Sequence, residues 1–341
     1  MTFVLGIDGG GSKTVCILMD DKCEILGRGE AGSSNYQSVG IEATKYSIES
    51  AIYNAIIEKE NIKIAAICLG LAGVGRAKDI EVIKSIVEDI ISSQTSEETP
   101  PQADSAEISM EETPPQPSPQ AGRGSFFCKN CNMIISHDAL IALVGGIGND
   151  VGIVVAAGTG SIIFGRNHRG ETKRVGGWGY LLGDEGGAYK IAVAGMEGAL
   201  RAYDGREIST SLVENFKNHL GLKSIEELIE VVYRRGWGVK EIAALAPIVD
   251  NAAASGDEVA NQIIDNALEE LVKATVTVIN GIFSGRKSLE IVTTGSVWKS
   301  KCKMWERFNT SINKKFPEVE VILPRFEAVY GAGLLALKSL R

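Results

Sequence analysis

The first part of the chain alternates between short apolar runs and stretches in which apolar residues recur at helical spacing. Apolar runs bounded by polar or glycine-rich turns predict strands, whereas apolar residues three or four positions apart predict amphipathic helices. The run at 62–69 is apolar throughout, which is typical of a buried parallel strand. The predicted order is three strands, helix, strand, helix, strand and helix, over residues 3–8, 14–19, 24–28, 41–61, 62–69, 80–90, 132–136 and 139–144.

A second copy of this pattern begins at residue 151. Strand, glycine turn, strand and polar turn follow one another over 151–170, as they do at the N-terminus. The repeat predicts two related α/β halves; the alternative is coincidence, since glycine turns between strands are common. The elements predicted for the second half are strands at 151–157, 162–166, 289–293 and 320–323, and helices at 186–203, 224–233, 239–255, 257–283 and 328–340.

Residues 92–125 interrupt the pattern. Six of the nine prolines lie here, and the hexapeptide Glu-Glu-Thr-Pro-Pro-Gln occurs twice, at 97–102 and 111–116. A segment rich in Pro, Glu, Ser and Gln buries too little apolar surface to offset the entropy lost on ordering it. We predict a disordered surface insertion, with a functional tether as the alternative.

Composition narrows the class of protein. A chain of 341 residues suggests about two domains. We place them at 1–137 and 138–341, and the closing helix is a candidate to pack back on the first domain.

The net charge of −8 argues against nucleic acid or an anionic membrane surface as the main partner. It does not argue against ATP, because a local nest of backbone N–H groups binds phosphate inside an acidic protein.

The N-terminal residues and the cysteines indicate in which cellular compartment the protein works. Met1 leads directly into a strand without a basic leader, and no apolar run is long enough to cross a bilayer. We therefore expect a cytoplasmic protein with reduced thiols. Cys128 and Cys131 form a lone Cys-x-x-Cys pair. A structural zinc site normally needs four ligands, so we do not expect metal binding there.

Two glycine turns are candidates for phosphate binding, Gly9–Ser12, to which Lys13 can add, and Gly158–Ser161. Each joins two predicted strands, whereas a dinucleotide-binding turn or a P-loop needs a helix after its glycines. The turns therefore predict a different device, a hairpin tip whose N–H groups face the ligand. The candidate ATP-binding residues in them are Gly10, Gly11, Ser12, Lys13, Gly158, Thr159 and Gly160.

Two carboxylates stand at the ends of predicted strands, one beside the first turn and one ahead of the second hairpin. Asp8 ends the first strand and is placed to hold Mg²⁺, directly or through water; the alternative is a turn-capping carboxylate. Asp138 stands where a strand ends and a helix begins, at the carboxyl edge where α/β sheets bind ligands. We assign Asp138 as the general base of a phosphoryl transfer, with a helix N-cap as the alternative.

The stretch Gly176–Gly187 is unusual because a tryptophan stands between glycines and an Asp-Glu pair follows. Such a sequence is poor material for a helix or strand and is typical of a binding loop. Aromatic faces stack on sugar rings, and carboxylates accept hydrogen bonds from sugar hydroxyls. The alternative is a structural loop that opens the following helix. The candidate sugar-binding residues in this stretch are Gly176, Gly177, Trp178 and Asp184.

With these motifs in view, the chain resembles the sugar kinases of the actin/hexokinase/Hsp70 superfamily. Within it, the chain is most similar to the N-acetylglucosamine kinases and their BadF/BadG-type ATPase relatives. The resemblance covers nearly the whole chain except the insertion, and it implies two RNase H-like domains that bind ATP and sugar in a cleft between them. It is carried by Ile7–Thr14, Asn35, Asp138-Ala139, Gly158–Ser161, Gly176–Gly179, Gly183–Gly186 and Gly295–Ser300.

The resemblance also implies roles for single residues. Asp138 matches the catalytic base that deprotonates the sugar 6-hydroxyl. The positions that match sugar contacts are Asn35, Asp138, Ser161, Gly177, Trp178 and Asp184. The positions that match ATP contacts are Ser12, Thr159, Gly295 and Ser296. A homodimer is usual in this group, so we expect one here.

Two positions depart from the animal members of the group. Tyr36 stands where those proteins have histidine, and Ile162 stands where they have asparagine. The choice between N-acetylglucosamine, glucosamine and another hexose therefore stays open. Our first interpretation is an ATP-dependent hexosamine kinase. The alternatives are a BadF-type ATPase that activates a radical dehydratase or reductase, with Cys128 and Cys131 as its cluster candidates, and a non-enzymatic sugar sensor.

Overall fold

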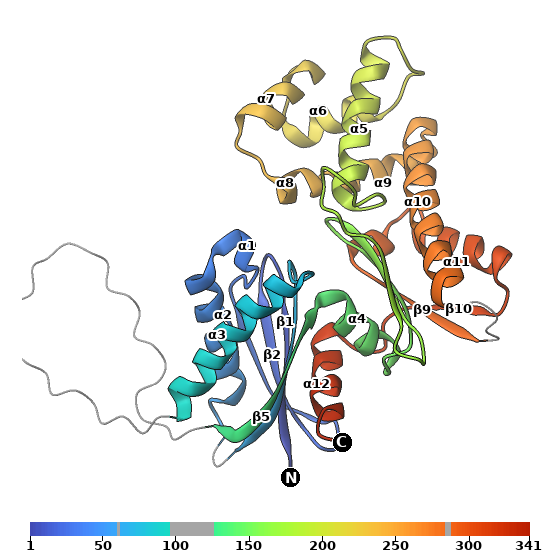
Figure 1. The fold of residues 1–341 in the computed structure, drawn as a ribbon. Coiled ribbons are helices and arrows are strands. Elements are labelled where there is room, and N and C mark those ends of the chain that lie inside the picture. The colour runs from blue at the N-terminus through green and yellow to red at the C-terminus, as the bar shows by residue number, and fades with distance from the viewer. Residues whose placement is uncertain (60–61, 96–125, 284–287) are drawn as a thin grey trace, which may run out of the picture. The chain divides into compact units, whose positions relative to one another are not determined.

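The computed structural model describes residues 1–59, 62–95, 126–283 and 288–341. These residues form two compact units, Met1–Ile141 with Ala328–Arg341, and Ala142–Glu327 (Figure 1). The predicted insertion lies outside the described residues from 96 to 125. Its first four positions belong instead to helix α3 (Ala77–Thr95), because polar residues such as Ser93, whose Oγ bonds the Ile90 carbonyl, continue the last turn.

The first unit is built on a mixed sheet with the strand order β3-β2-β1-β4-β5. The central strand pairs with an antiparallel hairpin strand on one side and with a parallel strand on the other. This confirms the predicted α/β class and is the RNase H-like order that the resemblance implied. The strands are β1 (Phe3–Gly9), β2 (Thr14–Asp20), β3 (Ile25–Ala31), β4 (Ile64–Leu71) and β5 (Phe127–His137).

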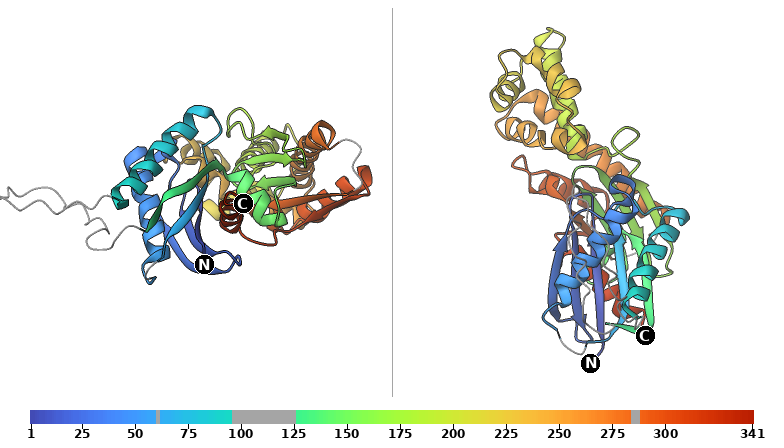
Figure 2. Two further views of the ribbon diagram at one scale, coloured as in Figure 1. Left: turned by 60° about the horizontal axis from the view of Figure 1, so that its bottom comes forward. Right: turned by 90° about the vertical axis from the view of Figure 1, so that its left-hand side faces the viewer.

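Helices cover both faces of this sheet, which is why β1 and β2 are buried along nearly their whole length. Helices α2 (Ile41–Ile56) and α3 lie on one face, and α12 (Ala328–Lys338) lies on the other (Figures 1 and 2). The short helix α1 (Tyr36–Val39) precedes α2. Apolar burial on both faces is the main source of stability of such a layer.

The second unit repeats this topology in the order β10-β9-β6-β7-β8. The central β6 pairs antiparallel with β7 and parallel with β9, which confirms the repeat predicted from the two glycine turns. Strand β8 was not predicted, because it is a largely polar edge strand. The strands are β6 (Gly152–Ala157), β7 (Ser161–Arg166), β8 (Thr172–Gly176), β9 (Leu289–Thr294) and β10 (Val319–Ile322).

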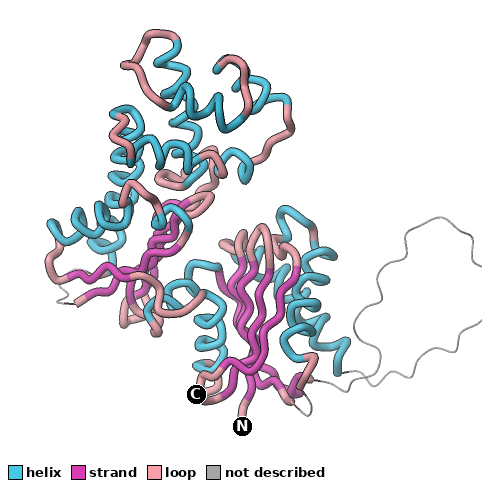
Figure 3. The backbone as a smooth tube through the Cα atoms, turned by 180° about the vertical axis from the view of Figure 1, so that it is seen from behind, coloured by secondary structure: helices cyan, strands magenta, loops and turns pink. Residues whose placement is uncertain are grey.

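Helices α5 to α9 gather beyond one end of the second sheet and share one apolar core with it (Figures 2 and 3). The single helix predicted over 239–255 is wrong: it is two helices, because Pro247 lies in the first turn of α9, the position where proline is tolerated. The helices are α4 (Asp138–Ile147), α5 (Ala188–Tyr203), α6 (Leu212–Leu220), η1 (Ile225–Glu227), α7 (Leu228–Arg234), α8 (Val239–Ala243), α9 (Ala246–Ala254), α10 (Glu258–Ile282), η2 (Ser296–Lys299) and α11 (Met304–Lys315).

Among the described residues, no helix has both the length and the apolar character that a membrane-spanning segment needs.

Candidate functional site

The register of the first sheet places the two candidate carboxylates at one edge. Asp8 on β1 is opposite Gly70 on β4, and Gly70 is opposite Ser136 on β5, so the three form one row. Neighbouring strands lie about 4.8 Å apart, so the backbones of Asp8 and Ser136 are about 10 Å apart. Asp138 follows Ser136 by two positions. The candidate metal ligand and the candidate base therefore share the carboxyl edge of this sheet.

Asp138 is the first residue of α4 and is half-buried. Its Oδ1 accepts a hydrogen bond of 2.9 Å from the Ala139 amide, and within the described residues its Oδ2 has no partner. The amide of Leu140 bonds Nδ1 of His137 instead, at 3.2 Å, which is the bond that an N-cap residue makes. His137 is thus the N-cap residue of α4, which is the role that the sequence analysis gave as the alternative for Asp138.

The first glycine turn is a tight hairpin tip. The Gly10 amide donates to the Lys13 carbonyl at 2.9 Å, and Ser33 Oγ donates to the Gly10 carbonyl at 3.1 Å. A Cβ on Gly11 would meet no atom of the described residues within 4 Å, so packing within that part of the chain does not require glycine there. This fits a backbone that a ligand approaches closely. Nζ of Lys13 lies 3.5 Å from Oε1 of Glu30, and both side chains are exposed.

Asn35 lies just after the residue whose amide bonds the Gly10 carbonyl, and its side chain caps α1 by accepting from the Gln37 amide at 3.2 Å. The next residue, Tyr36, donates its hydroxyl to Asp79 at 2.6 Å. Asp79 is buried and also pairs with Arg76 at 2.9 Å, which is the main reason that its pKa lies well below its usual value. No motif in the sequence marks this cluster, which holds the loop beside Asn35 in place.

The second glycine turn is tied to the start of α5. The Ala188 amide donates to the Gly158 carbonyl at 2.8 Å, and the Tyr189 amide donates to the Thr159 carbonyl at 3.0 Å. A Cβ on Gly158 would meet nothing within 4 Å, as at Gly11. Ser161, the first residue of β7, is buried and its Oγ donates to the Glu185 carbonyl at 2.6 Å. The turn and the predicted sugar loop are therefore joined.

Asp184 makes a second connection between this loop and the turn. A Cβ on Gly160 would lie 2.2 Å from Oδ2 of Asp184, so the carboxylate packs directly against the turn backbone. Its Oδ1 accepts from the Gly179 amide at 3.2 Å. Burial raises the pKa of Asp184, and hydrogen bonds from the amides of Gly179 and Ser161 partly offset that rise.

Trp178 lies on the surface of the second unit, with 68% of its area exposed. The Arg174 guanidinium stacks on its ring at 4.9 Å from the centroid, a cation–π arrangement. Arg174 also donates to the carbonyls of Gly176 and Gly177. Three of the four candidate sugar-binding residues of this loop are thus held by one arginine that the sequence did not single out.

The turn after β9 leads into a cavity. Gly295 has φ +110°, and a Cβ there would lie 2.2 Å from the Ala157 carbonyl oxygen, so only glycine fits. Ser296 begins η2 and borders a cavity of about 380 Å³ in the second unit. Ala188, whose amide bonds the Gly158 carbonyl, also borders it. Other lining residues, which the sequence did not predict, include Pro247, Asp250, Asn251, Lys301 and Met304.

Within the described ranges, no three His, Cys, Asp or Glu side chains gather as a metal cluster. Mg²⁺ in phosphate-binding sites usually takes one or two carboxylates together with substrate phosphates and water, so a single Asp8 at the sheet edge fits it. Cys128 and Cys131 belong to β5, which begins at Phe127 rather than at 132, because the parallel pairing with β4 extends to Phe127.

The model of the BadF/BadG/BcrA/BcrD ATPase family matches residues 5–336. The chain belongs to this family. The N-acetylmuramic acid/N-acetylglucosamine kinase of Clostridium acetobutylicum is 32% identical to it, and the alignment covers 98% of each protein. The N-acetyl-D-glucosamine kinase of Dictyostelium discoideum is 29% identical, again over 98% of each. Family membership confirms the resemblance and implies ATP as a ligand.

Solved structures of similar proteins confirm the fold of this family member. A candidate N-acetylglucosamine kinase from Chromobacterium violaceum gives a TM-score of 0.68 at 20% identity and covers 98% of this chain and 99% of its own. One from Porphyromonas gingivalis gives 0.65 at 21% identity, over 99% and 100% of the two chains. At these identities the likeness establishes the two-domain α/β architecture alone.

Proposed function

We propose that this chain is an ATP-dependent hexosamine kinase that phosphorylates the 6-hydroxyl of N-acetylglucosamine or glucosamine. The observation that carries the proposal is Asp138, a carboxylate whose Oδ2 has no partner among the described residues and which shares its sheet edge with Asp8 and the first glycine turn. The two relatives that span 98% of the chain are both named as N-acetylglucosamine kinases, which supports this reaction class.

The proposal assigns the nucleotide to two glycine turns and to the cavity beside Ser296. Backbone N–H groups of glycine turns are good phosphate donors, and Lys13 and the hydroxyls of Ser12 and Thr159 add to them. The cavity of about 380 Å³ beside Ser296 is lined by both apolar and polar groups and suits a nucleoside. The assigned ATP-binding residues are Gly10, Gly11, Ser12, Lys13, Gly158, Thr159, Gly160, Gly295 and Ser296.

The sugar is assigned to the predicted binding loop and to Asn35. Trp178 offers one exposed ring face, since Arg174 covers the other. Asp184 accepts hydrogen bonds from sugar hydroxyls, and its pairing with the Gly179 amide holds it in place. The assigned sugar-binding residues are Asn35, Asp138, Ser161, Gly176, Gly177, Trp178 and Asp184.

The chemistry follows from these assignments. Asp138 Oδ2 accepts the proton of the 6-hydroxyl as that oxygen attacks the γ-phosphorus, and the bond from the γ-phosphorus to the bridging oxygen breaks to give ADP. Donors from the two turns stabilise the charge on the transferred group. Asp8 would hold Mg²⁺, directly or through water, and the ion would neutralise charge on the phosphates.

The alternative role as a dehydratase activator is the weaker one, because the two relatives that span 98% of the chain are both named as N-acetylglucosamine kinases. We further propose that the kinase works in the cytoplasm as a homodimer on a small sugar, with neither nucleic acid nor a membrane as partner. Size-exclusion chromatography with light-scattering detection measures the oligomeric state.

A coupled assay of ADP release across a sugar panel tests the function. We expect ATP and Mg²⁺ to give ADP release that N-acetylglucosamine or glucosamine stimulates strongly, with the 6-phosphate as product. Glucose and N-acetylmuramic acid define the range of accepted sugars. If no sugar stimulates ADP release above the rate without sugar, the chain is not a hexose kinase and the proposal fails.

A further inference from the structure

The cavity beside Ser296 has two facing walls that one side chain joins. One wall is helix α9, and the other is the segment 296–301 that follows the Gly295 turn. Asp250 on α9 accepts from the Lys301 amide through Oδ2 at 2.9 Å and from the Cys302 amide through Oδ1 at 2.8 Å. Both carboxylate oxygens thus hold the opposite wall by its backbone.

The second of these donors belongs to a buried residue. The Cys302 side chain is buried, and burial together with the nearby Asp250 carboxylate raises the pKa of its thiol to about 12. Hydrogen bonds to an ionised acceptor are stronger than those between neutral groups, so the two amide bonds to Asp250 hold α9 against the segment that follows Gly295.

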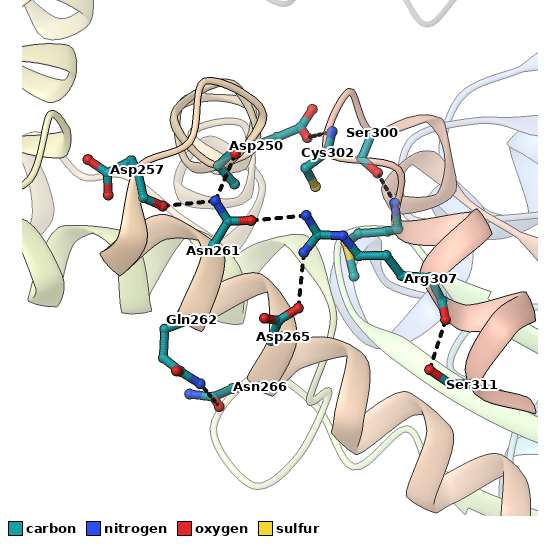
Figure 4. A network of polar contacts seen from close by, with 12 residues as sticks. Asp250, Asp257, Asn261, Gln262, Asp265, Asn266, Ser300, Cys302, Arg307 and Ser311 are labelled. Atoms are coloured by element: carbon teal, nitrogen blue, oxygen red, sulfur yellow. Dashed lines mark hydrogen bonds and ion pairs between the residues drawn. The ribbon is translucent and has the colours of Figure 1, made fainter. Parts of the chain in front are cut away.

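Further contacts close this connection into a ring (Figure 4). Asn261 on α10 donates to the carbonyl of Ala253 at the end of α9 at 2.8 Å, and Arg307 on α11 donates to Asn261 at 2.9 Å. The Met304 amide at the start of α11 donates to Ser300 Oγ at 2.9 Å. The ring runs from α9 through Asp250 to the segment 300–302, then through α11 and α10 back to α9. Asp250 is its one member that also lines the cavity from α9.

We propose that Asp250 is a positioning residue for nucleotide binding. It fixes the segment 296–301 against α9 and so keeps the width of the cavity that takes the nucleoside. This rests on the proposed function, which assigns the cavity to ATP. Asp250 does not act on the reacting atoms, so its removal alters nucleotide affinity and leaves the sugar site unchanged.

Asp250→Ala and Asp250→Asn test the inference, with Asp265→Asn as the matched control. Asp265 belongs to the same network, since it pairs with Arg307 at 3.0 Å, but it does not line the cavity. The measurements are calorimetric titration with ADP, KM for ATP, KM for N-acetylglucosamine and the unfolding temperature. We expect each Asp250 variant to raise the Kd of ADP and the KM of ATP about 10-fold, the loss typical of one charge-assisted hydrogen bond. KM for the sugar and all constants of Asp265→Asn stay at the wild-type values.

Separate outcomes distinguish this inference from the proposed function. If both Asp250 variants bind ADP as the wild type does, or if KM for sugar and for ATP rise together, Asp250 has no specific positioning role and the inference is wrong. If the wild type phosphorylates no sugar but Asp250→Asn still weakens ADP binding, the inference stands and the kinase proposal falls. Asp250→Asn keeps the shape of the side chain, so the test remains decisive if Asp250→Ala does not fold.

Discussion

Asp184 occupies a position that is unfavourable for stability. Its φ is +60°, in the left-handed region, which costs a residue with a side chain about 1 kcal/mol. Burial also raises the pKa of its carboxyl group. A carboxyl group whose folded pKa lies above its unfolded value lowers stability at neutral pH, and this penalty disappears as the pH falls through the folded pKa. A ligand that binds the carboxylate accounts for its presence better than folding does.

Asp184→Asn is therefore expected to separate stability from function. Asparagine tolerates the left-handed region, still accepts from the Gly179 amide and removes the cost of burying a charge. At pH 7 the unfolding temperature should equal or exceed that of the wild type, and any gain should shrink as the pH is lowered through the folded pKa of Asp184. kcat/KM for the sugar should fall about 10- to 100-fold. Thermal unfolding and steady-state kinetics check this; a less stable variant with unchanged sugar kinetics would contradict it.

Single residues differ in how far the sequence reveals them. Asp8 and Asp138 were predicted because a carboxylate at the end of a strand is a local pattern: Asp8 comes before a glycine turn, and Asp138 stands where a helix begins. Asp79 accepts from the nearby Arg76 and also from Tyr36, which lies 43 positions away along the chain. The two donors to Asp250, the amides of Lys301 and Cys302, lie 51 and 52 positions away. No local pattern marks contacts between such distant positions, so they emerge only from the folded chain.

At the scale of elements, two glycines of the first hairpin differ in what surrounds them. Gly6 packs closely against a helix, whereas Gly11 has room for a ligand. A Cβ on Gly6 would lie 2.4 Å from the amide nitrogen of Gly333 and 2.7 Å from the Val329 carbonyl oxygen, so β1 and α12 meet through their backbones. Gly11, at the end of the same hairpin, has open space around it. The two glycines are thus required for different reasons.

The substitutions Gly6→Ala and Gly11→Ala should consequently affect different properties, the first the stability of the fold and the second the binding of ATP. Gly6→Ala forces α12 away from β1 and should destabilise the fold by about 2 kcal/mol, as overpacking does. Gly11→Ala should leave stability unchanged and raise KM for ATP several-fold, because the methyl group obstructs the phosphates. Chemical denaturation and ATP titration measure the two effects. Unchanged ATP kinetics in Gly11→Ala would show that the first turn does not contact the nucleotide.

The elements themselves were largely predictable where periodicity is strong, as in α2 and β4. The sequence interpretation missed α11, although its buried residues Met304, Phe308 and Ile312 recur every four positions in an otherwise polar stretch. It also missed β8, since an exposed edge strand has little apolar alternation. Pro247 marks the break between α8 and α9, because proline is tolerated in the first turn of a helix but not in its interior.

For the whole molecule, the duplicated topology was predictable because each half opens with the same hairpin. Both sheets have a central strand flanked by a hairpin on one side and by parallel strands on the other. The apolar pattern of α12 predicts a helix, and packing on the first domain was a candidate arrangement for it. Its packing on β1, β2 and β4 depends on Gly6 and Gly333, which lie at opposite ends of the chain.

The proposed kinase is tested most directly by comparing phosphoryl transfer in Asp138→Asn with that in the wild type, at saturating ATP and hexosamine. The substitution keeps the size of the side chain but removes the proton acceptor. We predict that transfer falls at least about 1000-fold, a typical loss for a general base, while the Kd of ADP and the unfolding temperature stay at wild-type values. Transfer within a few-fold of the wild type would contradict the assignment of Asp138 and the mechanism built on it.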